Sequence, residues 1–288
     1  MSNQTLEKDF ENGNHLDGNM DPDSALRRIQ TSGSISVSPE LFEKIYLSPQ
    51  NKVAGDLRKT FGNPTPLALA GFLLSLTPLS CDLMGWRGAG GNGAASTGVF
   101  FFFGGLLMTL GSLGEFILGN TFPFVVFGTF GAFWLSYAAT LQPFYNSYGA
   151  YIAAPTDPVA SGLQTTGFNA SFAFFLVFMG VLCFLYMILA LRTNVVFFLI
   201  FMTLVPAFAL LAAAFWHLAE DYEGNAALAK TEVLAAGALT FVTDMCGWYI
   251  FFAILLASLD FPFQLPVGDL SRFVKGASEK GKRKDHPA

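Results

Sequence analysis

Six stretches of apolar residues follow one another along the chain, separated by polar or glycine-rich connections. They lie at about 66–85, 98–118, 122–143, 169–191, 195–217 and 233–259. A helix needs about 20 apolar residues to cross the hydrocarbon core of a bilayer, and each stretch meets that length. None alternates polar and apolar residues as a barrel strand does. The pattern predicts an all-α integral membrane protein with six transmembrane helices.

The polar residues divide the chain into three parts. Residues 1–62 form a predicted N-terminal tail, residues 63–259 hold the six spans, and residues 260–288 form a basic C-terminal tail. Within the first tail, apolar residues recur at helical spacing near 39–49, which is typical of a helix lying on a membrane surface. Membrane lipid is therefore an expected partner of the tails as well as of the spans.

Charged residues are rare in the spans, and the flanking Lys and Arg residues are unequally distributed between the two sides of the membrane. Only 13% of the residues are charged while 52% are hydrophobic, against about 25% charged in a soluble domain. Because cytoplasmic flanks carry an excess of Lys and Arg, the flanking residues predict that both termini are cytoplasmic. The terminal side carries Lys52, Arg58, Lys59, Arg192, Arg272 and Lys275, and the opposite side carries Arg87 and Lys230.

Several classes of function are disfavoured by the composition. A net charge of −5 and a pI near 5.2 argue against nucleic-acid binding. The three cysteines lie singly in apolar runs, and no paired metal-ligand or nucleophile motif is present. We therefore expect no metal, no cofactor and no enzymatic activity.

Two spans begin with related sequences, 62-GNPTPL-67 and 119-GNTFPF-124. Asn is a favoured N-cap and Pro is tolerated in a first helical turn, so Asn63 and Asn120 are predicted caps, with Pro64 and Pro66 shaping the first start. A helix N-terminus also presents free N–H groups to an anion, so a vestibule for a carboxylate is a second interpretation. Glu115 precedes Asn120 by five residues and is predicted to anchor the turn there.

Asp244 lies in the middle of the sixth predicted span. A charge at membrane depth is costly and usually faces a cavity or a partner. A pore-facing role and a buried, hydrogen-bonded role are both open for this carboxyl group.

At the two helix starts the chain resembles a known family. The stretches 63-NPTPLALAGF-72, 114-GEFILGNTFPF-124 and 131-GAFW-134 are similar to the signature blocks of the acetate uptake transporter family (succinate–acetate permease-like proteins), and 38–59 resembles its filamentous-fungal branch. The resemblance implies a plasma-membrane channel or transporter for acetate and other short monocarboxylates, assembled as a homo-hexamer with a pore in each protomer. Channel-like and proton-coupled (symport) transport are both known in the family.

The resemblance also assigns residues. It implies an apolar constriction of Phe72, Phe130 and Leu204, with Leu67 belonging to the helix-start motif beside the vestibule. Phe130 stands where the family has tyrosine, so this side chain offers no hydroxyl to a passing carboxylate. Asp244 also departs from the family pattern.

Two other functions remain as alternatives. One is export of ammonia or ammonium, with which some fungal members are linked. The other is a membrane sensor without transport, for which the serine-rich N-terminal tail is the supporting feature.

Overall fold

The computed structural model describes residues 15–16, 36–37, 57–270 and 273–274, and these residues form a helical bundle. Six of its helical segments are long and apolar enough to cross a membrane, as the sequence predicts. They are Thr65–Leu83, Gly91–Ile117, Thr121–Leu141, Thr166–Ala190, Val195–Glu220 and Ala226–Ser258. The predicted surface helix near 39–49 and most of the basic C-terminal tail lie outside the described residues.

The first, third, fourth, fifth and sixth spans are single helices. They are α5 (Thr65–Leu83), α8 (Thr121–Leu141), α9 (Thr166–Ala190), α10 (Val195–Glu220) and α11 (Ala226–Ser258). The second span is composite, with η3 (Gly91–Ser96), α6 (Thr97–Val99), η4 (Phe100–Leu107) and α7 (Met108–Ile117) in succession. In η4 the backbone is π-helical, which the sequence pattern did not predict.

Short elements complete the described part. They are β1 (His15–Leu16), paired in parallel with β2 (Ser36–Val37), then α4 (Leu57–Thr60), η2 (Trp86–Gly88), η5 (Pro143–Tyr145), η6 (Gly149–Tyr151) and η7 (Val159–Gln164).

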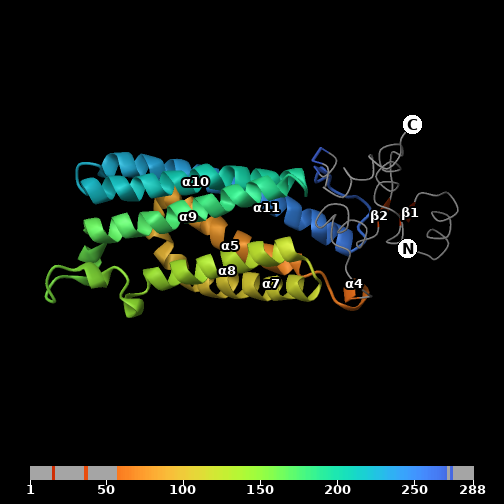
Figure 1. The fold of residues 1–288 in the computed structure, drawn as a ribbon, viewed down its shortest axis with the longest axis horizontal. Helices are drawn as coiled ribbons and strands as arrows, with labels where there is room; N and C mark the ends of the chain where they lie inside the picture. The colour runs from red at the N-terminus through yellow and green to blue at the C-terminus, as the bar shows by residue number, and fades with distance from the viewer. Residues whose placement is uncertain (1–14, 17–35, 38–56, 271–272, 275–288) are drawn as a thin grey trace, which may run out of the picture.

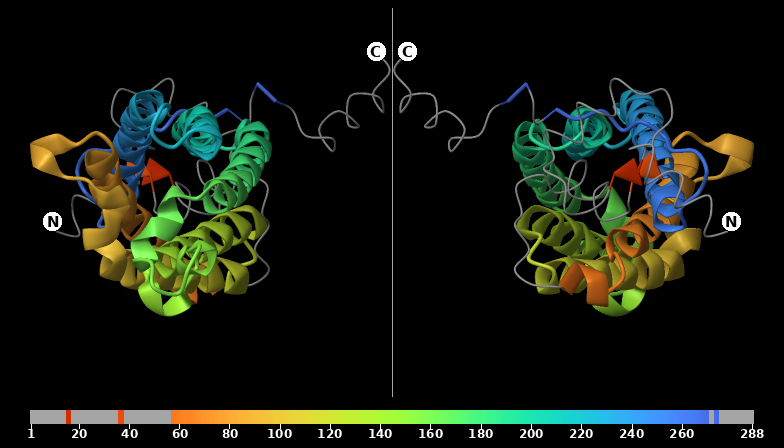
Figure 2. Two further views of the ribbon diagram at one scale, coloured as in Figure 1. Left: turned by 90° about the vertical axis from the view of Figure 1, so that its left-hand side faces the viewer. Right: turned by 90° about the vertical axis from the view of Figure 1, so that its right-hand side faces the viewer.

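The spans form two groups that α5 connects. Figure 1 shows α9, α10 and α11 along one side of the bundle and α7 and α8 along the other, with α5 between them. Viewed along the bundle, the helices surround a common centre (Figure 2). Successive spans are antiparallel, so α5, α8 and α10 all start at the end of the bundle where α4 lies (Figure 1).

Small residues allow α5 to lie very close to the second span. A Cβ atom added at Gly71 would fall 2.5 Å from the main-chain oxygen of Phe103, and one at Gly111 would fall 2.6 Å from the Cβ of Ala68. Glycine at such positions lets helix backbones approach in a membrane, where van der Waals packing drives association. This close contact fixes α5 as one wall of the bundle centre.

Candidate functional site

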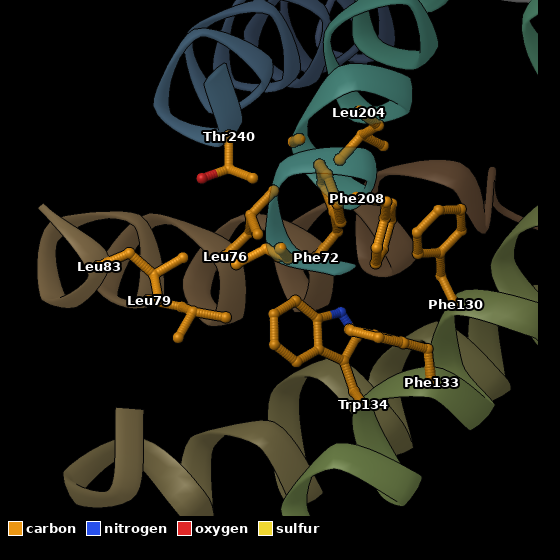
Figure 3. A pocket seen from close by; sticks show the side chains of 12 residues that line it. Phe72, Leu76, Leu79, Leu83, Phe130, Phe133, Trp134, Leu204, Phe208 and Thr240 are labelled. Carbon is orange, nitrogen blue, oxygen red and sulfur yellow. The ribbon is translucent and has the colours of Figure 1, made fainter. Parts of the chain in front are cut away.

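An apolar cavity of about 40 Å³ lies between α5, α8, α10 and α11. This volume has room for a few water molecules, since one needs at least 10–15 Å³ on the same measure. None of the side chains around it is charged (Figure 3). The lining residues are Phe72, Leu76, Leu79, Leu83, Phe130, Phe133, Trp134, Leu204, Ala207, Phe208, Leu211 and Thr240.

The three residues expected to form a constriction all line this cavity. Phe72 comes from α5, Phe130 from α8 and Leu204 from α10, and each is nearly fully buried. The rings of Phe72 and Phe130 meet edge to face with centroids 6.3 Å apart, an arrangement that aromatic pairs prefer. Side chains distant in sequence therefore meet around one apolar cavity.

Three aromatic lining residues were not identified from the sequence. Phe133 and Trp134 lie one turn beyond Phe130 on α8, and Phe208 lies one turn beyond Leu204 on α10. The ring of Phe133 contacts that of Phe208 with centroids 5.7 Å apart. The spacing in the sequence could have identified them, because residues three and four positions apart share a helix face.

The cavity wall has two polar groups with different hydrogen-bond roles. Trp134 is 1% exposed and its Nε1–H has no hydrogen-bond partner, although it lines the cavity. Thr240 lies across the cavity from this indole (Figure 3). An unpaired buried N–H costs about 1–3 kcal/mol, so a ligand oxygen at this point would relieve that cost.

Glu115 joins the starts of two cavity-lining helices. Its Oε1 accepts a hydrogen bond from the hydroxyl of Thr65 at the start of α5, and its Oε2 accepts one from Nδ2 of Asn120, 2.6 Å away, before α8. The carboxyl group is fully buried. The expected anchoring of the turn by Glu115 is thus present, and it extends to α5.

Asn120 is the N-cap residue of α8 as predicted, but its side chain has a different partner from the expected one. The side chain makes no cap hydrogen bond and instead donates to Glu115. A hydrogen bond to a charged group contributes more than one to a neutral group, which explains why the carboxylate takes this amide.

The α5 start differs from the α8 start. The N-cap residue of α5 is Pro64 rather than the predicted Asn63, and Asn63 Oδ1 accepts a hydrogen bond from the main-chain N–H of Thr65 at 2.9 Å. Pro64 packs so tightly on Gly114 of α7 that an added Cβ there would lie 2.5 Å from the proline Cβ. Pro66 follows in the first helical turn, and Leu67 points outward with 42% of its surface exposed.

A third asparagine precedes a helix at the same end. Asn194 Oδ1 accepts a hydrogen bond from the N–H of Phe197, at 2.9 Å, and so caps α10. All three helices that carry Phe72, Phe130 and Leu204 therefore begin after an asparagine. At 1.5 Å per residue, these starts lie about 10–15 Å along the helices from Phe72, Phe130 and Leu204.

Asp244 is buried between α11 and α5 and does not line the cavity itself. Its Oδ2 lies 3.0 Å from the hydroxyl oxygen of Ser80 on α5, which in turn lies 2.8 Å from the hydroxyl oxygen of Thr240. Since Thr240 reaches the cavity, Asp244 is connected to it through two hydroxyl groups. The sequence located this carboxyl group but not its connection.

Metal-binding geometry is not found in the described ranges. No group of three or more His, Cys, Asp or Glu side chains gathers there, and Cys81, Cys183 and Cys246 are free thiols. The ionisable contact at the opposite end is His217 with Glu232, where Nδ1 and Oε2 are 3.0 Å apart.

Comparison with known proteins agrees with this geometry. Residues 46–272 match the model of the GPR1/FUN34/yaaH family. The chain is 50% identical to protein alcS of Aspergillus fumigatus over 250 residues, 87% of this chain and 90% of that protein. It is 32% identical to the acetate transporter protein patA of Aspergillus clavatus over 211 residues, covering 73% and 79% of the two chains.

A solved structure matches the same fold. The bacterial acetate channel SatP superposes with a TM-score of 0.57 at 25% identity, covering 72% of this chain and 99% of that chain. The expected class, a membrane transport protein rather than an enzyme, is confirmed by these matches. This chain belongs to the GPR1/FUN34/yaaH family, the acetate uptake transporters.

Proposed function

We propose that this protein carries acetate and other short monocarboxylates across the membrane through the cavity between α5, α8, α10 and α11. The observation that carries the proposal is the cavity lining. Phe72, Phe130 and Leu204 close the passage from three helices, and no lining side chain is charged.

The lining chemistry explains how such a passage would discriminate. A hydrated ion must lose its water to enter, and an unpartnered charge in an apolar space is strongly disfavoured. A short monocarboxylate has an apolar methyl or alkyl end that suits the rings, and Trp134 and Thr240 are the lining residues whose side chains carry a hydrogen-bonding group.

The asparagine-headed helix starts form the proposed inner vestibule. Each helix N-terminus has a partial positive charge and free N–H groups that favour an anion. Three such ends lie on one side of the cavity, and Glu115 holds two of them together. Asn63, Pro64 and Pro66 shape this entrance, and we assign it, with both termini, to the cytoplasmic side of the plasma membrane.

The outer surface of the second span supports an oligomer. Its exposed side chains are large and apolar and recur at helical spacing. They are Phe102, Leu106, Leu110, Leu113 and Ile117. We propose that this ridge packs against a neighbouring protomer in a homo-hexamer whose protomers each contain their own passage.

Uptake of labelled acetate into proteoliposomes tests the function. We expect uptake above that of empty vesicles, and we expect Leu204→Trp to abolish it by filling the cavity. Leu189→Trp is the matched control, because Leu189 is 55% exposed on the outer face of α9. Wild-type uptake equal to that of empty vesicles would exclude the assignment.

Ammonia transport is the second candidate, and one observation favours it. A cavity without charged side chains also admits a small neutral base. In the same vesicles, ammonium-dependent internal alkalinisation without acetate would support this candidate. Acetate uptake with no such signal would reject it.

A further inference from the structure

Asp244 belongs to a polar chain that starts at the cavity wall. Thr240 and Asp244 are four residues apart on α11 and therefore share one helix face. Ser80 of α5 lies between them, with its Oγ 2.8 Å from Thr240 Oγ1 and 3.0 Å from Asp244 Oδ2. Ser80 and Asp244 are fully buried, whereas Thr240 borders the cavity.

The surroundings of Asp244 favour reversible uptake of a proton. The hydroxyl groups of Ser80 and Thr77 are the hydrogen-bond donors beside Asp244, and an ionised carboxylate at membrane depth is costly without a cation. The titratable groups near it are Cys81 and Asp82 of α5 and Cys246 of α11, and none of them is a cation. The stretch of α10 packed at this level, around Thr203, carries no charged residue.

The hydroxyl groups between Asp244 and the cavity can reverse their hydrogen bonds. Ser80 has one hydroxyl hydrogen but three acceptors in reach, namely Leu76 O at 2.9 Å, Thr240 Oγ1 and Asp244 Oδ2. Thr240 has an alternative acceptor in the main-chain oxygen of Gly237, at 3.0 Å. When Asp244 is ionised, Ser80 donates to it; when Asp244 is protonated, Ser80 accepts from it and donates onward.

We propose that Asp244 is a proton-binding site that exchanges a proton with a carboxylate in the cavity by way of Ser80 and Thr240. This inference rests on the proposed function. In the forward step the Asp244 O–H passes its proton to Ser80 Oγ, the Ser80 hydrogen moves to Thr240, and the Thr240 hydrogen moves to the bound carboxylate. One O–H bond is lost at Asp244 and one forms on the substrate, so the negative charge moves from the substrate to Asp244.

Protonation of the substrate removes the cost of moving a negative charge through the apolar passage. The substrate then crosses the ring of Phe72, Phe130 and Leu204 as the neutral acid, for which the apolar lining is suited. On the far side the neutral acid leaves and gives its proton to water there, and Asp244 takes its next proton from water on the entry side by way of Thr240 and Ser80. Net movement is one acid molecule with its proton, which makes flux depend on the proton gradient.

Proteoliposomes with an imposed pH gradient and a clamped membrane potential test the proposal, with the flux of empty vesicles subtracted. We expect an inward proton gradient to accelerate wild-type acetate uptake at least fivefold. We expect Asp244→Asn and Ser80→Ala to lose this acceleration while acetate exchange at equal pH persists. Thr243→Val is the matched control, because Thr243 is buried on α11 but pairs with Thr203, 2.6 Å away, outside the relay.

A spectroscopic readout checks the assignment without transport. Infrared difference spectra between acidic and alkaline pH contain the C=O stretch of every carboxyl group that takes up a proton, and subtracting the Asp244→Asn spectrum from the wild-type spectrum should leave one component that belongs to Asp244. Identical spectra of wild type and Asp244→Asn would overturn the proposal. If Asp244→Asn does not fold, the flux of Ser80→Ala supplies the decisive result.

The outcomes separate this inference from the proposed function. Wild-type acetate uptake that ignores the proton gradient overturns the relay and leaves the transport function intact. Gradient acceleration that survives in Ser80→Ala overturns the relay, and so does an equal loss of exchange and of gradient-driven uptake in folded Asp244→Asn. Absence of any wild-type uptake instead defeats the transport function.

Discussion

The Glu115 connection between two helix starts makes a quantitative prediction for Asn120→Asp. In the wild type, Asn120 Nδ2 donates to Glu115 Oε2 over 2.6 Å, and both groups are buried. The substitution replaces this donor with an acceptor and places a second carboxylate against the first. Two unit charges 2.6 Å apart repel by about 6 kcal/mol at an effective dielectric constant of about 20.

Uptake of a proton limits that cost. Holding one carboxyl group of the pair protonated at pH 7, against a reference pKa of about 3.9, costs about 4 kcal/mol at about 1.36 kcal/mol per pH unit. At pH 5 the same cost is about 1.5 kcal/mol. The variant carboxyl group binds its proton more tightly in the folded protein, so the lost stability returns as the pH falls towards the reference pKa.

Thermal unfolding of the detergent-solubilised protein between pH 5 and pH 8 measures the effect. At about 2–4 °C for each kcal/mol in a chain of 150–250 residues, we expect the melting temperature of Asn120→Asp to fall by about 8–16 °C at pH 7. Most of this loss should disappear at pH 5. Acetate uptake should fall in parallel, because the two helix starts separate.

Two further variants provide the controls. Adding Glu115→Gln to Asn120→Asp should restore stability at pH 7, because a glutamine amide can donate to the new carboxylate. Asn63→Asp should leave stability nearly unchanged, because Asn63 already acts as an acceptor through Oδ1. A melting temperature of Asn120→Asp equal to that of the wild type at pH 7, or a loss that Glu115→Gln does not relieve, would refute the reasoning.

Three other predictions concern the cavity and the packing around it. Leu204→Ala should cost about 2–5 kcal/mol of stability, as buried leucine truncations do. It should also raise butyrate uptake relative to acetate uptake in vesicle assays. A ratio of butyrate to acetate uptake equal to that of the wild type would exclude Leu204 from the constriction. Trp134→Phe should raise the KM for acetate about fivefold, because the variant lacks the unpaired N–H. Trp248→Phe should leave the KM unchanged, because the Trp248 N–H already donates to a threonine hydroxyl. Equal KM values for Trp134→Phe and wild type would contradict the donor role. Gly71→Ala should lower the melting temperature because its Cβ would meet a main-chain oxygen at 2.5 Å, whereas Gly98→Ala meets nothing within 4 Å; similar melting temperatures for the two would argue against the close helix contact.

The spans could be predicted from the sequence because hydropathy reports the membrane directly. The ends of the helices were harder to predict, since a helix can continue beyond the hydrocarbon core of the membrane. The sixth span was predicted from residue 233, but α11 begins at Ala226. The added residues include Lys230 and Glu232, which form helix readily but are too polar for a hydropathy pattern.

Site residues that belong to a recognisable sequence motif could be predicted, whereas contacts between residues distant in sequence could not. The stretch beginning at Asn63 led, through the family resemblance, to Phe72, Phe130 and Leu204, which all line the cavity. Nothing local indicated that Ser80 would meet Asp244, which is 164 residues away, or that Thr65 would meet Glu115. Asn120 takes the predicted N-cap position without a side-chain cap hydrogen bond, because its amide donates to a buried carboxylate five residues earlier.

Cysteine labelling at Leu204 tests most directly whether acetate passes through the cavity. With Cys81, Cys183 and Cys246 replaced by alanine, Leu204→Cys should transport acetate, lose transport on reaction with a thiol-specific methanethiosulfonate reagent, and react more slowly when acetate is present. Modification that leaves acetate uptake at its starting rate would show that the substrate does not pass this point and would contradict the account.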